Sequence, residues 1–421
     1  MSEIVVHKFG GSCLREKGDI DRIYNIIKNT KESPVIVVSA IWGMTDRLIR
    51  AERDPAYAGR LVQDLRSQHL IFAPGLDKGE FSDLFERVMS GISNNLLEYT
   101  SGEASSHCKN LILAAGERLS ALAVAHRLRE LGLEKAQPIG AEDVGLKLKG
   151  KGRAKEINIE LSSKHLDKKR LVGIPVLTGW FGEGEDGNIA VLSRGGSDHS
   201  AAAFANLLNA KKLILWKDVD GIKRLNPRWG LETPSIPYLN YEQALELSLH
   251  GTPIIHPATV IPLVEIGIPI EVRNFHKPTS NTPTTIGPEA ASSGVIAIGC
   301  YPGVAVITNN KQLSSLLLSK IEEFDVSPWL MKSTPDSLKL IIPTHDFDRL
   351  EEFVEGKTEF KTAIVSIIGD CEIPSGYEIV SSNEYATRVI VETDNLSKTI
   401  DEIYHSCLLY TSDAADDGYR G

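Results

Sequence analysis

The sequence has few cysteines, no long hydrophobic run and no basic cluster. Its five cysteines, at positions 13, 108, 300, 371 and 407 of 421 residues, have no short paired spacing, which argues against a zinc site or a disulfide framework. No segment approaches the roughly eighteen apolar residues of a membrane-spanning helix, and the N-terminal residues lack a signal-peptide pattern. We therefore expect a cytoplasmic protein without a membrane partner, and we assign no side chains as metal ligands.

Positive charge is also in deficit. The chain has 46 Lys and Arg against 56 Asp and Glu, a formal net charge of −10, and no basic patch interleaved with aromatic residues, so we expect no nucleic-acid partner. With 42% hydrophobic and 24% charged residues, the chain has enough apolar material for two or three domains. The composition favours a globular protein that acts on small molecules.

Two glycine-containing turns are the most informative segments. Residues 192–198 combine Arg194, two glycines, two serines and an aspartate ahead of an alanine-rich helix. A helix start offers unpaired N–H groups, the glycines let a ligand approach the backbone, and an arginine binds a carboxylate through two parallel hydrogen bonds. A second turn, Lys8-Phe9-Gly10-Gly11-Ser12, follows a short apolar strand. Together the turns predict a ligand with two anionic ends.

Short apolar strands alternate with amphipathic helices along the first two-thirds of the chain. This order predicts an α/β fold with a mostly parallel sheet covered by helices on both faces. We expect strands at 4–7, 35–39, 176–178, 213–216 and 268–272, and helices at 19–28, 81–97, 111–131 and 241–249. Ligands bind at the carboxyl ends of such strands. The turns after Val6, Val38, Thr178 and Trp216 should therefore share one rim.

The amino-acid composition changes near 278–294, where Pro, Thr, Ser, Asn and Gly predominate. This composition indicates a linker. Beyond it, two strand and helix units suggest small α+β modules for ligand sensing or dimerisation. We place one domain at 1–287 and a tandem pair of modules at 295–406. Residues 407–421 resemble a translated sequencing-adaptor read-through, so we expect a non-native or disordered tail there.

Six ordered sequence blocks together resemble the aspartokinase branch of the amino-acid-kinase family. They are Lys8-Phe9-Gly10-Gly11-Ser12, Val38-Ser39-Ala40 with Gly43-Met44-Thr45, Gly116-Glu117-Arg118-Leu119-Ser120, Ser193-Arg194-Gly195-Gly196-Ser197-Asp198, Asp218-Val219-Asp220-Gly221-Ile222 and Ile255-His256-Pro257-Ala258-Thr259. The resemblance implies the family's open, mostly parallel sheet sandwiched by helices, followed by a ferredoxin-like pair of ACT domains. It also implies an ATP- and Mg²⁺-dependent kinase that makes 4-phospho-L-aspartate, at the entry to lysine, threonine and methionine synthesis.

Phosphorylating a carboxylate requires alignment of two anions and stabilisation of charge on the transferring phosphoryl group. By the resemblance, Lys8 is the stabilising cation, and Asp198 orients Lys8 or its water network rather than acting as a base. Gly10, Gly11 and Ser12 would present backbone donors to the phosphates.

The resemblance also assigns the amino-acid end of the site. Glu117 would accept the substrate's ammonium group, and Arg194 would bind its α-carboxylate. The hydroxyl groups of Ser39, Thr45 and Ser197 would complete the aspartate pocket.

At the nucleotide end, the resemblance implicates Asp218 and Arg228. Many family members carry a lysine at the position of Pro253, and that cation is absent here. Lys217 follows an expected strand on the same rim, so we expect it to supply the missing charge. His256 is expected to be a packed or hydrogen-bonded structural residue.

Two other functions stay open at this point. Glu117 and Arg194 would bind the α-amino and α-carboxylate groups of another acidic amino acid equally well. The Pro253 change would also suit a catalytically weakened amino-acid sensor, although intact Lys8 and Asp198 argue against it. The ACT resemblance implies an amino-acid effector and a homodimer or higher oligomer formed through these domains.

Overall fold

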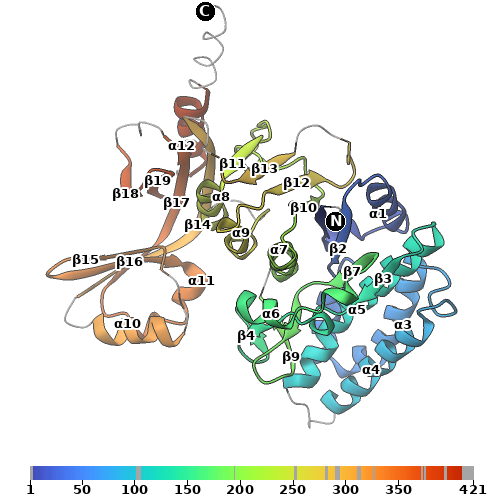
Figure 1. The fold of residues 1–421 in the computed structure, drawn as a ribbon. Coiled ribbons are helices and arrows are strands. Elements are labelled where there is room, and N and C mark those ends of the chain that lie inside the picture. Colours follow the sequence, from blue (N-terminus) through green and yellow to red (C-terminus); the bar gives the residue numbers. More distant parts are fainter. Residues whose placement is uncertain are drawn as a thin grey trace, which may run out of the picture. The chain divides into compact units, whose positions relative to one another are not determined.

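The computed structural model describes residues 3–100, 106–193, 195–250, 254–279, 283–289, 294–310, 314–324, 326, 328–370, 373, 376–392 and 396–409. The chain divides into two units (Figure 1). The first comprises Met1–Ile222, Pro237–Tyr241 and Ile255–Glu289, and the second comprises Lys223–Ile236, Glu242–Ile254 and Ala290–Gly421. The sequence-based boundary placed 223–236 and 242–254 with the first domain, whereas these two segments pack with the second unit.

An eight-stranded sheet organises the first unit, in the order β11-β13-β12-β10-β1-β2-β7-β3. Its strands are β1 (Ile4–Phe9), β2 (Ser33–Val38), β3 (Ala136–Ile139), β7 (Ile174–Thr178), β10 (Lys212–Lys217), β11 (Tyr238–Asn240), β12 (Ile270–Asn274) and β13 (Thr284–Gly287). Every neighbouring pair is parallel except β12 and β13. Because β10, β1, β2 and β7 are consecutive and parallel, their carboxyl ends lie at one edge, which confirms the predicted rim.

Helices cover both faces of this sheet. They are α1 (Asp19–Lys28), α2 (Met44–Arg53), α3 (Pro55–Phe72), α4 (Ser82–Thr100), α5 (Ser106–Glu130), α6 (Ile159–His165), α7 (Gly196–Leu207) and α9 (Pro257–Val264). Val5 and Phe9 of β1 join a core that includes residues of α1 and α5. Side chains alternate between faces along a strand, so Val6 and Lys8 lie on the opposite face, where α7 contacts β1, β2 and β10.

Short strands complete the first unit beside the main sheet. β5 (Arg153–Ala154), β9 (Ile189–Leu192) and β8 (Phe181–Glu183) form a three-stranded sheet, and β4 (Leu148–Lys149) pairs with β6 (Glu156–Ile157). β9 leads directly into the turn that precedes α7, so this small sheet fixes one end of that turn.

A six-stranded antiparallel sheet forms the second unit, in the order β15-β16-β14-β17-β19-β18. Its strands are β14 (Val295–Asn310), β15 (Leu330–Ser333), β16 (Ser337–Pro343), β17 (Lys357–Gly369), β18 (Glu378–Ser382) and β19 (Ala386–Glu392), and the unit also contains α8 (Tyr241–His250), α10 (Ser314–Glu323), α11 (Thr344–Phe347) and α12 (Leu396–Ile403). The unit contains separate hydrophobic clusters. The long strand β14 contributes residues to two of them, and β17 contributes to one of these two. Two α+β modules therefore share one sheet, which short local patterns did not predict.

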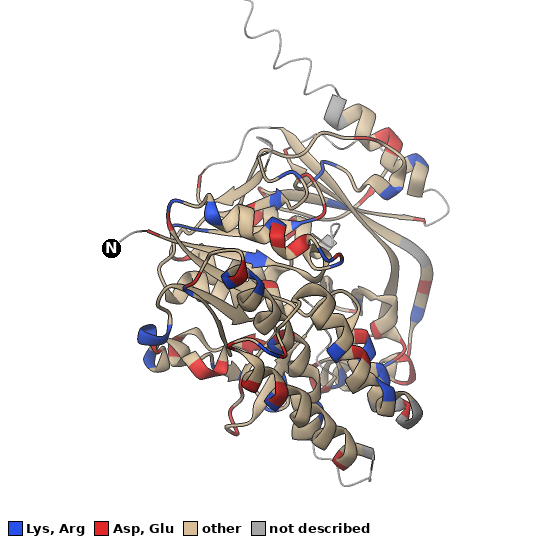
Figure 2. Cartoon of the chain, turned by 90° about the vertical axis from the view of Figure 1, so that its right-hand side faces the viewer, with Lys and Arg blue, Asp and Glu red and all other residues tan. Residues whose placement is uncertain are grey.

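Basic and acidic residues are interspersed over the helices and loops (Figure 2). Partly or largely exposed ion pairs such as Arg66–Glu86 and Arg127–Asp21 join some of them. Within the described ranges, we find no helix with the length and apolar character needed to cross a bilayer.

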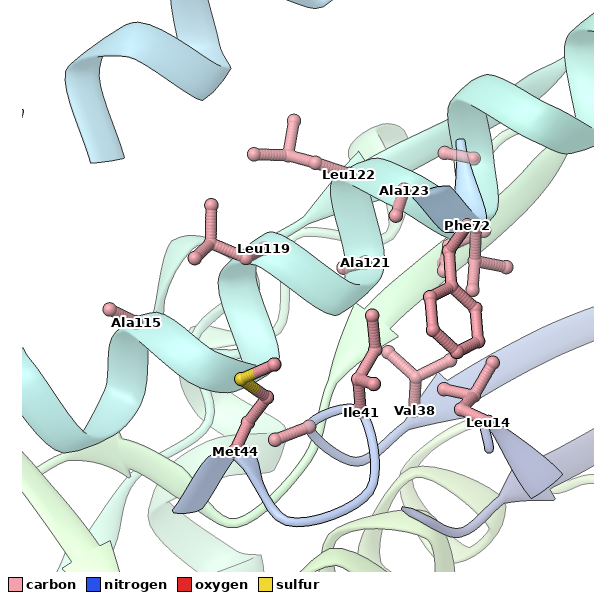
Figure 3. Close-up of a cluster of buried hydrophobic side chains, with 14 of the residues drawn as sticks. Leu14, Val38, Ile41, Met44, Phe72, Ala115, Leu119, Ala121, Leu122 and Ala123 are labelled. Atoms are coloured by element: carbon pink, nitrogen blue, oxygen red, sulfur yellow. The ribbon is translucent and has the colours of Figure 1, made fainter. Parts of the chain in front are cut away.

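The core around α5 should make a large contribution to the stability of the first unit. Leu119 is fully buried there, in the hydrophobic cluster that also contains Met44 and Val38 (Figure 3). Leu119→Ala should lower the free energy of unfolding by about 2–5 kcal/mol, because it leaves a cavity. The matched control Leu97→Ala, at a side chain that is 69% exposed on α4, should change it by less than about 0.5 kcal/mol. Chemical denaturation measures both values, and equal losses would contradict this description of the core.

Candidate active site

A buried carboxylate lies between two ammonium groups at the carboxyl edge of the parallel sheet. Asp198 is in the first turn of α7, with Oδ1 2.5 Å from Lys8 Nζ and Oδ2 2.7 Å from Lys217 Nζ. The strand register explains the meeting of the lysines. Lys8 of β1 is opposite Leu215 of β10, and Lys217 lies two residues further along β10, on the same face of the sheet.

The charges of this cluster affect the pKa values of Asp198 and Lys8. Burial opposes ionisation of Asp198, but the charges of Lys217 and Lys8 outweigh burial and hold the pKa of this carboxyl well below its usual range. Burial lowers the pKa of Lys8, and repulsion by Lys217 adds to the lowering, while Asp198 opposes it. With both lysines protonated, the cluster carries one excess positive charge and attracts an anion.

The glycine turn after β1 brings the backbone close to this cluster. A Cβ atom added at Gly10 would lie 3.1 Å from Lys8 Nζ, and one added at Gly11 would lie 3.3 Å from the Ala40 carbonyl oxygen. Both approaches are tight for a side chain. Half-buried Ser12 follows in a short 3₁₀ turn, Gly11–Cys13. The glycines therefore let the Lys8 ammonium group and the Ala40 carbonyl approach the backbone of this turn.

Glu117 lies on α5 beside the loop that follows β2. Its side chain is buried, with Oε1 accepting a hydrogen bond from the Ala40 N–H at 3.3 Å, and Oε2 has no hydrogen-bond partner among the described residues. Burial raises the pKa of this carboxyl to about 8. A Cβ atom at Gly116 would lie 3.0 Å from Ala40 Cβ, so α5 packs closely on the segment that carries half-buried Ser39 and Thr45.

Gly179, which follows β7, lies close to the start of α7 at this rim. A Cβ atom at Gly179 would lie 2.8 Å from Ser197 Cβ, so a larger residue would displace the start of the helix. Gly195 precedes α7 with a φ of 83°, a conformation that favours glycine. Arg194 and Pro253 lie outside the described residues.

Trp180 is a feature of this rim that the sequence did not signal. Its φ of 70° is rare for a bulky residue. Ser200 Oγ of α7 accepts a hydrogen bond from the Trp180 N–H at 3.1 Å, and the Trp180 carbonyl accepts one from the Leu192 N–H at 2.8 Å. The strained backbone is thus held from two sides, next to the contact between Gly179 and Ser197.

Asp218 follows Lys217 directly, at the solvent-facing end of β10. Its Oδ2 lies 3.3 Å from an Arg15 guanidinium nitrogen, and both side chains are about two-fifths exposed. The Arg15 guanidinium also stacks over the Trp42 ring at 3.8 Å. These contacts connect the segments after β10, β1 and β2.

Arg228 and His256 make hydrogen bonds to backbone groups rather than to the ion cluster, although the Asp198 charge opposes the lowering of the His256 pKa by burial. Arg228 belongs to the second unit, where its guanidinium donates a hydrogen bond to the Cys300 carbonyl at 3.2 Å. His256 caps the start of α9 by accepting a hydrogen bond from the Ala258 N–H at 3.2 Å. A hydrogen-bonded structural role for His256 agrees with the expectation from sequence.

Comparison with known proteins places this arrangement in a family. Residues 3–274 match the model of the amino acid kinase family. The chloroplastic bifunctional aspartokinase/homoserine dehydrogenase 2 of Arabidopsis thaliana is 32% identical over 286 residues, which cover 64% of this chain and 31% of that protein. The chain thus spans about a third of this relative's length. Aspartokinase 3 of Bacillus subtilis is 24% identical over 397 residues, covering 87% of this chain and 86% of that protein.

Solved structures share the fold. The crystal structure of E. coli aspartokinase III with aspartate and ADP, in the R-state, has a TM-score of 0.81 at 20% identity and covers 96% of this chain and 99% of that one. The same enzyme with lysine and aspartate, in the T-state, has a TM-score of 0.74 at 20% identity, covering 96% of this chain and 100% of that one. These matches confirm the predicted fold class, including the C-terminal antiparallel region expected for ACT domains. Because the family model covers more than half of the sequence, the chain belongs to the amino acid kinase family.

Proposed function

We propose that the protein is an aspartate kinase, which transfers the γ-phosphate of ATP to the side-chain carboxylate of L-aspartate. The products are 4-phospho-L-aspartate and ADP, and the reaction opens the synthesis of lysine, threonine and methionine. The observation that carries this proposal is the placement of Asp198 between Lys8 and Lys217 at the ligand-binding edge of an amino-acid-kinase sheet. The Bacillus subtilis relative, which matches most of the chain, is named an aspartokinase.

The proposed reaction needs no enzyme nucleophile. An oxygen of the aspartate carboxylate forms a bond to the γ-phosphorus, the bond from that phosphorus to the bridging oxygen breaks, and its electron pair leaves with ADP. The carboxylate is already ionised at neutral pH, so no base has to remove a proton. The ammonium group of Lys8 stabilises the charge on the transferring group, and backbone N–H groups of Gly10, Gly11 and Ser12 hold the phosphates.

The amino-acid end of the proposed substrate would be recognised by opposite charges. Glu117 offers a buried carboxylate whose Oε2 has no hydrogen-bond partner among the described residues, and a substrate ammonium group would satisfy it. We assign the α-carboxylate to Arg194, and contacts to the rest of the amino acid to the hydroxyl groups of Ser39, Thr45 and Ser197. The packing of α5 on the loop after β2, and of α7 on the end of β7, supports this grouping.

We assign Mg²⁺ as the second cofactor, beside ATP. Mg²⁺ binds phosphate and carboxylate oxygens and usually keeps several waters. The Asp218 carboxylate is about two-fifths exposed at the end of β10, so its chemistry and accessibility fit a contact with the ion, direct or through water. When bound, Mg²⁺ would neutralise phosphate charge and align the γ-phosphate. For Arg228, contact with the nucleotide remains a prediction from sequence.

The second unit is proposed to regulate the first and to assemble copies of the chain. Its shared sheet carries two α+β modules, as expected for a pair of ACT domains, and such domains bind amino-acid effectors and dimerise. The related E. coli aspartokinase III was crystallised with lysine. Sedimentation of the intact chain with and without lysine or threonine tests whether the chain assembles and whether an amino acid alters that assembly. A cytoplasmic location remains a prediction.

The substrate is tested by measuring ADP release with ATP, Mg²⁺ and either aspartate, glutamate or no amino acid. We expect release that depends on aspartate. Lys8→Ala should lower kcat by about a hundredfold or more, as for loss of one group that stabilises charge in the transition state, while the thermal transition of the variant shows that it folds. Equal turnover with glutamate would assign another acidic substrate, and amino-acid-independent release would refute the proposal.

The ionisation of Glu117 predicts a dependence on pH. Burial raises the pKa of Glu117 to about 8 in the ligand-free site, so this group must lose a proton before it can pair with an ammonium group. The kcat/KM for aspartate should therefore rise by roughly tenfold per pH unit from pH 6 towards 7.5 and level off above about pH 8. Glu117→Gln should lower kcat/KM at least about tenfold and abolish this rise.

Thermal stability provides the control for this variant. The folded state favours neutral Glu117, so its contribution to stability is complete below the ordinary glutamate pKa and is lost as pH rises through about 8. Glu117→Gln should melt at or above the temperature of the unmodified protein at pH 8. A variant that loses stability at pH 8, or that keeps the pH dependence of kcat/KM, would contradict the assignment.

A further inference from the structure

Lys217 is not needed to neutralise the charge of the ion cluster. Asp198 carries one negative charge, and Lys8 alone would balance it. The three side chains are well buried, with exposures of 6% for Lys8, 8% for Asp198 and 18% for Lys217. Burying a second ammonium group beside the first costs desolvation and repulsion. Such a cost is expected where a bound anion supplies the missing negative charge.

We infer that Lys217 is a second phosphate-binding cation, which contacts the γ-phosphate of the nucleotide while Asp198 holds it in position. This inference rests on the proposed ATP-dependent function. Asp198 would act as a positioning residue for both lysines, with one carboxylate oxygen for each ammonium group. The two cations would then share the negative charge of the transferring phosphoryl group.

The geometry of Lys217 leaves its ammonium group able to take a further ligand. An ammonium group has three N–H donors, and the hydrogen bond from Lys217 Nζ to Asp198 Oδ2 uses one of them. Lys217 is also the most exposed member of the cluster, so an incoming phosphate can reach it. Its backbone is fixed at the end of β10, where its carbonyl accepts a hydrogen bond from the Phe275 N–H at 2.7 Å.

A purely structural role for Lys217 makes a different prediction. If Lys217 only held Asp198 in place, its loss would disturb the carboxylate, destabilise the fold and weaken all ligands alike. If it binds the γ-phosphate, its loss relieves repulsion with Lys8 in the ligand-free protein and weakens only ligands that carry that phosphate. Nucleotide selectivity and thermal stability therefore separate the two roles.

The test compares Lys217→Met with Lys217→Arg in the intact chain. Calorimetry should show that Lys217→Met weakens binding of the non-hydrolysable analogue β,γ-imido-ATP, with Mg²⁺, at least about tenfold but weakens ADP binding less than about threefold. Lys217→Arg keeps the charge and should recover part of the loss. In turnover, kcat should fall at least about tenfold while the KM for aspartate changes little. The melting temperature of Lys217→Met should not fall.

Lys212→Met is the matched control. Lys212 is the first residue of the same strand, and its ammonium group pairs with Glu271 at 2.7 Å, so losing it should leave nucleotide selectivity and turnover unchanged. Equal weakening of ADP and the imido analogue by Lys217→Met, or no weakening of either, would overturn the inference. Because binding is measured without an amino acid, a failed aspartate assay with a selective loss of imido-ATP binding would reject the proposed substrate and retain the role of Lys217.

Discussion

The ion pairs of Asp198 with Lys8 and Lys217 are the interaction on which the proposed chemistry depends. They join the first turn of α7 to two neighbouring parallel strands, so the sheet register rather than loops alone positions the charges to which we assign the chemistry. Glycines at the ends of β1 and β7 let the backbone approach these charges and the start of α7. The fold thus concentrates positive charge at one edge of the sheet.

Two buried carboxylates in this unit ionise in opposite ways because their surroundings differ. Two adjacent ammonium groups keep Asp198 ionised, whereas burial raises the pKa of Glu117 to about 8. Environment alone therefore divides the proposed site into a phosphate end, with its cations already in place, and an amino-acid end, where the substrate brings the cation. A ligand-free site that is partly unsatisfied at both ends favours substrates that carry both an ammonium group and anionic groups.

Periodicity predicted much of the fold but not its long-range packing. The strands of the rim, helix α1 and the shared edge followed from local patterns. The turn from Lys8 to Ser12 indicated an anion site, and its assignment to phosphate rests on the family resemblance and stays a prediction. Sequence could not reveal that 223–236 and 242–254 pack with the second unit, or that β14 extends through both modules, because such contacts depend on distant segments. Lys217 was expected at the rim, but its pairing with Asp198 depends on the register between β1 and β10.

The central claim is that Asp198 positions two ammonium groups on one transferring phosphoryl group. A crystal structure of the protein with ADP, Mg²⁺, aspartate and aluminium fluoride, a mimic of that group, tests it most directly. The account predicts that Lys8 Nζ and Lys217 Nζ both lie within hydrogen-bond distance of the fluoride ligands, about 3 Å, while each keeps its contact with Asp198. A mimic bound away from Asp198, or contacted by Lys8 while Lys217 points to solvent, would contradict the claim.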